Sequence, residues 1–185
     1  MNIIKRCFSL MLCLVSYMAA ADEFVAKHSG IKIVQNGVAI AMMSDDEAGT
    51  TVVQLVPEAF EIHSPDAMTQ VCTWSSATIF TKVKAGSDIM QDFNSCMFLY
   101  KSMAMNKEAD YLILSQDNGY SLNESHGSRK ISEQEFVYTV TQLLEHGKQM
   151  SKKALGVAVF MVVWIDANKN KVVDEDEFDR LELRF

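Results

Sequence analysis

The hydrophobic and polar positions of the chain change period several times, and each change predicts an element. Residues 31–44, IKIVQNGVAIAMMS, place Asn36-Gly37 between two apolar, β-rich runs, which is the pattern of a hairpin with a two-residue turn. Residues 50–63 return to strand chemistry on both sides of Pro57. Because proline cannot donate to a ladder, this segment is an edge strand, a bulged strand or two short strands.

Other stretches are more uniformly apolar. Residues 155–165, LGVAVFMVVWI, are crowded with valine, and uniform burial with β-branching favours a central strand. Residues 111–115, YLILS, predict a short buried strand, with a return strand over 120–122. Residues 71–83 fit either a strand or one face of a helix, and their content of Val, Thr, Trp, Ile and Phe favours the strand.

Two segments carry a helical pattern. Ser87 can cap a helix that runs from residue 88 to about residue 105, with apolar side chains at helical spacing. The sequence Ser-Glu-Gln-Glu at 132–135 is a capping box, and it opens a helix over 133–145 that Gly147 ends. The chain is therefore predicted to be α+β, with one domain over residues 22–185 that is mainly antiparallel sheet with two main helices.

Residues 1–21 predict export. Lys5 and Arg6 precede an apolar stretch of about a dozen residues, and the three alanines at 19–21 supply the small residues of a signal peptidase site before Asp22. An uncleaved membrane anchor is the alternative, but the apolar stretch is shorter than the roughly 20 residues that span a bilayer. We expect a periplasmic or secreted bacterial protein that has no integral membrane segment after cleavage.

The net charge of the chain restricts the kinds of binding partner that we expect. The chain has 17 basic and 24 acidic residues, a net charge of −7. Removal of Lys5 and Arg6 leaves 15 basic residues against the same 24 acidic ones, a net charge of −9. Such a surface repels phosphate backbones and anionic lipid, so we expect no nucleic-acid partner.

Cysteine use agrees with export. Cys72 and Cys96 remain after the signal peptide has taken Cys7 and Cys13 away. An even pair in an oxidising compartment predicts a disulfide. The alternative is a reactive thiol, but the Cys-x-x-Cys spacing that lowers a thiol pKa is absent from the sequence.

The most informative polar stretch is DANKNKVVDEDE, residues 166–177. Oxygen-bearing side chains stand at residues 166, 168 and 170, and a glutamate stands eleven positions after the first aspartate. Ca²⁺ takes about six to eight oxygen ligands, and one short loop supplies them only by curling around the ion. The spacing predicts such a loop.

This stretch resembles the calcium loop of EF-hand and related Asp-x-Asp-x-Asp-type proteins, over these residues alone. The resemblance implies that Ca²⁺ is bound by one backbone carbonyl, one carboxylate acting through a water, and four side chains that bind directly. The direct side-chain ligands would be Asp166, Asn168, Asn170 and Glu177, the carbonyl would be that of Val172, and the water-mediated ligand would be Asp174.

The stretch departs from the family in two ways. Lys171 stands where the family has a glycine in a sharp turn, and a positive φ at a non-glycine residue costs about 1 kcal/mol. The entering segment is also predicted as a strand instead of a helix. We therefore expect a single weak structural site, with a Kd of about 10⁻⁴ to 10⁻³ M. The alternative is a plain acidic turn, for which calcium would not change thermal stability.

Two classes of function stay open. The first is a non-enzymatic exported domain that has one calcium site and binds an unknown protein or envelope component. The second is an exported hydrolase whose acids come from distant segments, with Glu58 and Glu61 or Asp45 and Glu47 as the pairs to inspect. No phosphate-binding loop, nucleophile elbow or zinc-type histidine spacing occurs in the sequence.

Overall fold

The computed structural model of the chain describes residues 24–45, 47–66, 68–88, 96–98, 111–114, 129–132, 135–154 and 156–185. This part of the chain is almost entirely β structure, and its only helix is the single turn α2 (Ala77–Phe80). The predicted α+β fold with two main helices is therefore wrong. The predicted signal peptide, residues 1–21, lies outside the described residues.

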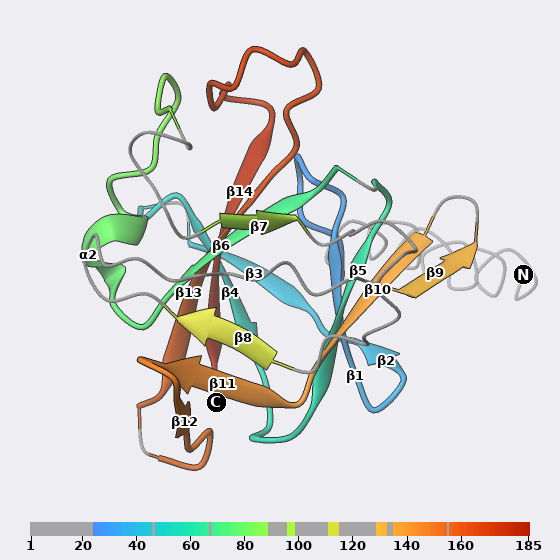
Figure 1. Cartoon of the computed structure of the whole chain (residues 1–185), viewed down its shortest axis with the longest axis vertical. Helices are drawn as coiled ribbons and strands as arrows, with labels where there is room; N and C mark the ends of the chain where they lie inside the picture. The colour runs from blue at the N-terminus through green and yellow to red at the C-terminus, as the bar shows by residue number, and fades with distance from the viewer. Residues whose placement is uncertain are drawn as a thin grey trace, which may run out of the picture.

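The strands form three sheets (Figure 1). The five-stranded sheet contains, in spatial order, β2 (Val38–Ala39), β1 (Lys32–Gln35), β5 (Phe60–Ser64), β10 (Glu135–Val140) and β9 (Arg129–Ser132). The six-stranded sheet contains β3 (Met42–Asp45), β4 (Thr50–Gln54), β14 (Phe178–Arg184), β13 (Ala158–Trp164), β6 (Gln70–Trp74) and β7 (Cys96–Phe98). The three-stranded sheet contains β12 (Lys148–Met150), β11 (Gln142–Glu145) and β8 (Tyr111–Leu114).

Most neighbouring strands are antiparallel, and the described parallel pairs are β4 with β14 and β8 with β11. Only Thr141 separates β10 from β11, so the chain passes from the five-stranded to the three-stranded sheet within one residue. The predicted antiparallel pairing is thus the rule, but it is spread over three sheets.

The strand β13 lies inside the six-stranded sheet, between β14 and β6. One side of it, including Met161 and Val163, packs into the larger hydrophobic core, and the other side, including Val162 and Trp164, packs into a second core. Burial of both faces explains why every residue of this strand is apolar. The predicted central strand over 155–165 is confirmed over Ala158–Trp164, and residue 155 lies outside the described residues.

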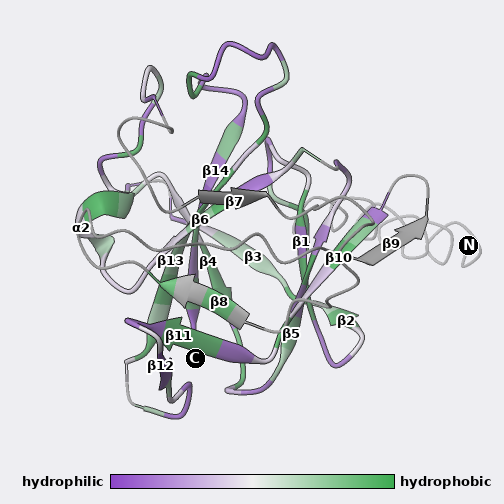
Figure 2. Cartoon of the chain, viewed as in Figure 1, coloured by the Kyte–Doolittle hydropathy of each residue, from purple (hydrophilic) through white to green (hydrophobic). Residues whose placement is uncertain are grey.

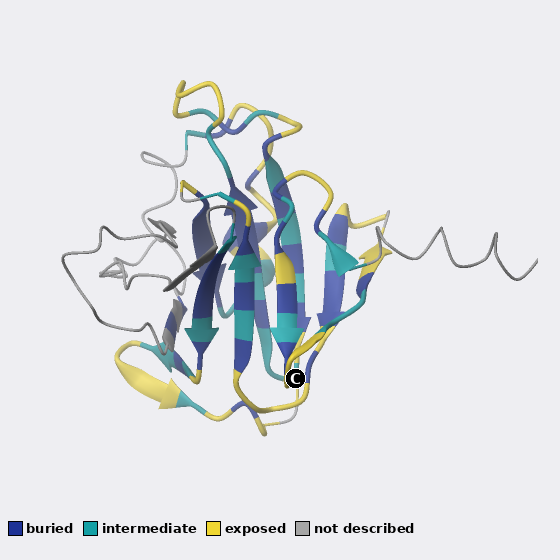
Figure 3. Ribbon diagram, turned by 90° about the vertical axis from the view of Figure 1, so that its right-hand side faces the viewer, coloured by how far each residue is buried: buried dark blue, intermediate teal, exposed yellow. Residues whose placement is uncertain are grey.

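The larger core joins the three sheets. It contains Ile62 of β5 and Tyr138 of β10 from the five-stranded sheet, Leu181 of β14 from the six-stranded sheet, and Leu143 of β11 from the three-stranded sheet, all of them buried. Figure 3 shows buried residues concentrated along the strands and exposed residues at the loops between them. Figure 2 shows the same division in hydropathy. The described loops are therefore the parts of the chain that are free to carry polar sites.

The hairpin at residues 31–44 is confirmed for β1 and β2. Asn36 and Gly37 form its two-residue turn with φ values of 53° and 76°. These left-handed values are the reason for the Asn-Gly sequence. The segment around Pro57 is two short strands, β4 and β5, which belong to different sheets.

The predicted helix over 133–145 is wrong, because β10 and β11 occupy most of it. Phe136, Tyr138 and Val140 alternate into the interior, and β10 pairs with β5 over five residues. Aromatic and β-branched side chains favour that pairing more than the capping box favours a helix. Gly147 ends a strand instead, in the two-residue turn between β11 and β12.

The predicted helix over 88–105 is wrong where it can be compared. Residues 96–98 form β7, and Asp88 makes an isolated antiparallel bridge with Val172. Residues 89–95 and 99–105 lie outside the described residues, as does the predicted return strand over 120–122. In the described part of the chain, no helix has the length and apolarity needed to span a bilayer.

The two-sided burial of β13 leads to a test. Met161→Ala empties space between the sheets and should lower the free energy of unfolding by about 2–5 kcal/mol, whereas Met43→Ala on the exposed part of β3 should change it by no more than about 0.5 kcal/mol. Urea unfolding of both variants measures the difference. Similar losses for the two variants would contradict this account of the core.

Candidate metal site in the β13–β14 loop

The 166–177 loop connects β13 to β14, at the top of the view in Figure 1. The ladder of the two strands ends at the pair Trp164 and Phe178, and the N–H of Ile165 donates to the carbonyl of Glu177 at 3.0 Å. Antiparallel pairing therefore brings the first and last residues of the loop to neighbouring positions.

Asp166 organises the first half of the loop. Its Oδ1 accepts the N–H of Asn170 at 3.0 Å, and its Oδ2 accepts the N–H of Lys171 at 3.1 Å. Lys169 and Lys171 have φ values of 62° and 64°, in the left-handed region. The sharp turn that the family makes with glycine is thus present here with Lys171 in its place, at a cost of about 1 kcal/mol.

The three predicted ligands in the middle of the loop face one another. The amide nitrogens of Asn168 and Asn170 donate to Oδ2 of Asp174, at 2.6 Å and 3.0 Å. Oδ1 of Asn168 accepts the N–H of Asn170 at 2.9 Å, and Oδ1 of Asn170 accepts the N–H of Val172 at 2.7 Å. A carbonyl oxygen has two lone pairs, so each amide oxygen can still coordinate a cation.

Glu177 is the buried end of the loop. Its Oε1 accepts the N–H of Ala167 at 3.0 Å and that of Asn168 at 3.4 Å. Its Oε2 is buried and has no hydrogen-bond partner in the part of the chain that the structure describes, and the residue is 8 % exposed. An acceptor left without a partner in the interior costs about 1–3 kcal/mol, and more when it is charged, so this oxygen is a strong candidate to bind a cation.

The three carboxylates of the predicted ligand set do not form a preformed metal site. Within the described residues, no three or more His, Cys, Asp or Glu side chains are grouped so that they could hold a metal ion. The contacts of Asp174 explain part of this, because amide groups hold one of its oxygens. A cation in this loop would therefore depend on amide and backbone oxygens as well as on the carboxylates.

The loop is also attached to a distant segment. The N–H of Val173 donates to the carbonyl of Ser87 at 2.9 Å, the N–H of Gly86 donates to the carbonyl of Val173 at 2.8 Å, and Val172 bridges to Asp88. Val173 is fully buried in the second core, together with Val83 and the apolar residues of α2. The order of the loop is therefore linked to that of residues 83–88.

Arg180 makes a second link to the same segment. Its Nε donates to the carbonyl of Val83 at 3.1 Å, and its Nη2 donates to the same oxygen. Its guanidinium carbon lies 5.6 Å from the centre of the Phe178 ring. Burial lowers the pKa of Arg180 from its ordinary value, because the guanidinium loses hydration. β14 thus holds residue 83 by a charged hydrogen bond just beyond the loop.

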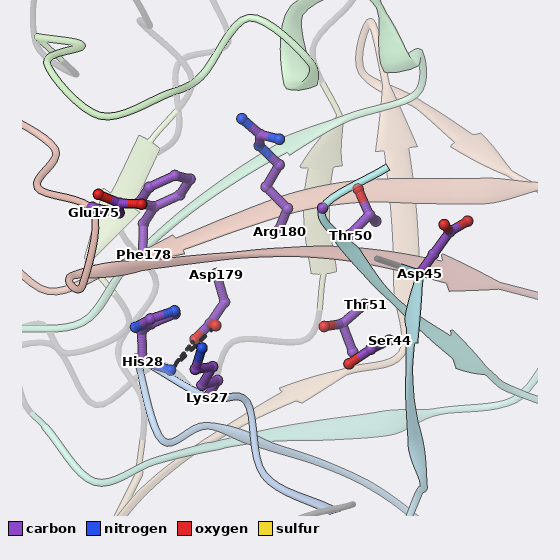
Figure 4. A pocket seen from close by; sticks show the side chains of 11 residues that line it. Lys27, His28, Ser44, Asp45, Thr50, Thr51, Glu175, Phe178, Asp179 and Arg180 are labelled. Atoms are coloured by element: carbon purple, nitrogen blue, oxygen red, sulfur yellow. Dashed lines mark hydrogen bonds between the residues drawn. The ribbon is translucent and has the colours of Figure 1, made fainter. Parts of the chain in front are cut away.

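An open hollow of about 240 Å³ adjoins the loop through Glu175 (Figure 4). The carboxylate of Asp179, in its wall, accepts the N–H groups of His28 and Ser29, and its Oδ2 lies 2.6 Å from the Ser29 hydroxyl. These bonds anchor the 24–31 turn on β14. Asp179 was not among the predicted site residues, although a charged residue two and four positions before Leu181 and Leu183, on the same buried side of β14, was a signal.

The acidic pairs of the hydrolase hypothesis make separate contacts. Glu58 accepts from the amide of Asn36 at 3.2 Å, whereas Glu61 contacts Nε2 of His63 at 2.9 Å. Glu135 contacts the other ring nitrogen of His63 at 2.8 Å, so two carboxylates occupy both nitrogens of this histidine.

The second acidic pair is no closer to a catalytic arrangement. Oδ1 of Asp45 accepts the N–H of Ala48 at 3.2 Å within the exposed turn that also contains Glu47. Neither pair is brought together around a common point among the described contacts.

Cys72 and Cys96 are partners in the register of β6 and β7. Residues directly opposite on antiparallel strands have Cα atoms about 4.5–5.5 Å apart, which lies within the range that a disulfide requires. Cys72 is fully buried in the second core. This register supports the predicted disulfide, which stays a prediction.

Comparison with known proteins adds no family to this picture, because no family model, no curated protein and no solved structure matches the chain.

The register of the cysteines leads to a second test. Protein expressed from Asp22 onwards, which lacks Cys7 and Cys13, should show no thiol that reacts with a maleimide when it is denatured without reduction, as measured by mass. Reduction should lower the free energy of unfolding by about 3 kcal/mol, since the bridge closes a loop of about 25 residues. Two labelled cysteines in the unreduced protein would overturn the pairing.

Proposed function

We propose that the chain is an exported bacterial domain, periplasmic or secreted, in which residues 166–177 bind one structural Ca²⁺. The observation that carries this proposal is the buried Oε2 of Glu177, which has no partner among the described residues, in a loop where Asn168 and Asn170 both donate to Asp174. Oxygen ligands on a short, curled loop are the donors that Ca²⁺ prefers.

Each predicted ligand has a role that its contacts allow. Glu177 would bind through both carboxylate oxygens, and the Oδ atoms of Asp166, Asn168 and Asn170 would bind directly. Asp174 would act through a water, and the carbonyl of Val172 would complete the site. When bound, the cation supplies positive charge for three carboxylates, and these residues hold it between β13 and β14.

The affinity of the 166–177 loop for calcium should be low. Only three of the proposed ligands are charged, and Lys169 and Lys171 bring two positive charges into the loop. A Kd of about 10⁻⁴ M would stabilise the fold by roughly 1.4 kcal/mol at about 1 mM free calcium, a concentration that exported proteins can meet. This is the size of a structural contribution and is small for a switch.

The role that we propose for the domain is binding, with an unidentified protein or envelope component as the partner. Two features support it over hydrolysis. The acidic pairs make separate contacts, and both nitrogens of His63 are engaged by carboxylates, so neither predicted acidic pair stands beside a free base. The calcium would then serve to hold the loop and the 83–88 segment in one arrangement.

Calorimetric titration tests the metal site. Wild-type protein should release or absorb heat on addition of Ca²⁺, with a Kd of about 10⁻⁴ to 10⁻³ M, and Asp166→Ala should lose this signal because it removes a ligand and the contacts that shape the turn. Asp176→Ala is the matched control, since this acid lies outside the proposed ligand set. Equal heats for wild type and Asp166→Ala would remove the metal from the account.

The variant Asn170→Asp distinguishes a cation site from a plain acidic turn. Asn170→Asp replaces a donor to Asp174 by a second carboxylate, so the variant should lose about 1 kcal/mol of stability in the presence of a chelator. The same change adds a charged ligand and should raise calcium affinity by about tenfold. Thermal unfolding with chelator and with calcium measures both effects.

A plain turn predicts a different result for this variant. Asn170→Asp would then be destabilised by the same amount in both solutions, and its unfolding temperature would not respond to calcium. Asn170→Ala serves as a control that removes the amide without adding charge.

A further inference from the structure

Lys152 is a buried cation at the opposite end of the molecule from the 166–177 loop. It follows β12, at the bottom of the view in Figure 1, and it is only 8 % exposed. Its Nζ donates to the carbonyl oxygens of Glu58 and Thr141, both at 2.9 Å. These two residues lie 94 and 11 positions away in the chain, so folding assembles this environment.

In the described part of the chain, the contacts of the ammonium are with backbone carbonyls and aromatic rings. Nζ lies 5.5 Å from the centre of the Phe60 ring and 5.9 Å from that of Phe185, and it makes no ion pair with a described carboxylate. Burial lowers the pKa of Lys152 from its ordinary value, because the ammonium loses hydration. A buried charge that is held without a counter-ion is costly, and this cost leaves a strong attraction for an anion.

An open hollow of about 230 Å³ lies beside this ammonium. Its wall carries hydrogen-bond donors on Lys153, Gln142, Gln149 and Ser151. The acid in the wall is Glu58, whose Oε2 accepts from the amide of Asn36.

We propose that this hollow binds a small carboxylate, with the Lys152 ammonium as its main contact. An ammonium has three N–H groups, and the two carbonyls take two of them. The third N–H would donate to a carboxylate oxygen of a ligand in the hollow and form a charge-assisted hydrogen bond. The volume suits a compound of a few carbon atoms, such as a dicarboxylate.

A purely structural lysine is the competing explanation. By holding the carbonyls of Glu58 and Thr141, Lys152 links the loop before β5 to the junction of β10 and β11. That role needs no anion and predicts no ligand. The two explanations differ in whether the negative charge of a ligand matters.

Titration with succinate, followed by NMR chemical shifts of the purified protein, tests the proposal. Succinamide is the matched ligand, because it has the same skeleton without charge. Wild-type protein should bind succinate at least about tenfold more tightly than succinamide, and Lys152→Met should reduce succinate binding by about tenfold or more. Lys148→Met, at an exposed lysine of β12 that does not line the hollow, should change succinate binding by less than about threefold.

A variant that keeps Lys152 guards against loss of folding. Gln149→Glu puts a carboxylate in the wall of the hollow, so it should weaken succinate binding by about tenfold while leaving the lysine and its carbonyl contacts in place. The proposal is overturned if succinate and succinamide bind equally, if neither binds at tens of millimolar, or if Gln149→Glu binds succinate as wild type does. Calcium binding at the other end of the molecule should be the same in all of these variants.

Discussion

The central position of β13 is the constraint on which the rest of the structure depends. A strand that is buried on both faces and paired on both edges has no freedom to slip, because a shift of one residue would exchange the faces of every side chain. The ladder with β14 therefore ends at a fixed pair, Trp164 and Phe178. The twelve residues after Ile165 have to reverse the chain direction between Trp164 and Phe178, which are partners on neighbouring strands. This connection brings polar side chains of the loop close to one another.

Contacts of the 166–177 loop and of β14 also fix another segment of the chain. Val173 belongs to the second core and pairs with Ser87 and Gly86, while Arg180 holds the carbonyl of Val83. The segment from Val83 to Asp88 is thus fixed by contacts that come from the loop and from β14. The Lys152 hollow is lined by other segments, which are the turn after β12, the loop before β5 and the junction of β10 and β11. The two sites are therefore expected to act independently.

Sequence patterns predicted the parts that depend on local chemistry. The valine-rich run gave β13, Asn36-Gly37 gave the first hairpin, and alternating oxygens located the 166–177 loop. The pattern failed at residues 133–145, because Phe136, Val140, Leu143 and Leu144 fit a helical face while Phe136, Tyr138 and Val140 also fit a strand. Pairing with β5, more than 70 residues earlier in the chain, decided between the two, and no local signal contains that contact.

Asp179 and Lys152 are the two most important polar side chains outside the loop, and their roles could not be predicted from the sequence for the same reason. Asp179 holds backbone groups about 150 residues away, and Lys152 holds a carbonyl 94 residues away. Neither contact leaves a motif, because each partner is a backbone atom or a single hydroxyl. Strand order and the division into three sheets are likewise set by long-range pairing that single-sequence periodicity does not encode.

Amide hydrogen exchange at Val173 tests the central claim most directly, because its N–H bonds to Ser87 at the point where the loop joins the rest of the fold. Calcium at about 1 mM should slow exchange by up to about tenfold both in 166–177 and in 84–88, as expected for a Kd near 10⁻⁴ M. Exchange rates that are identical with calcium and with chelator would contradict a cation in this loop.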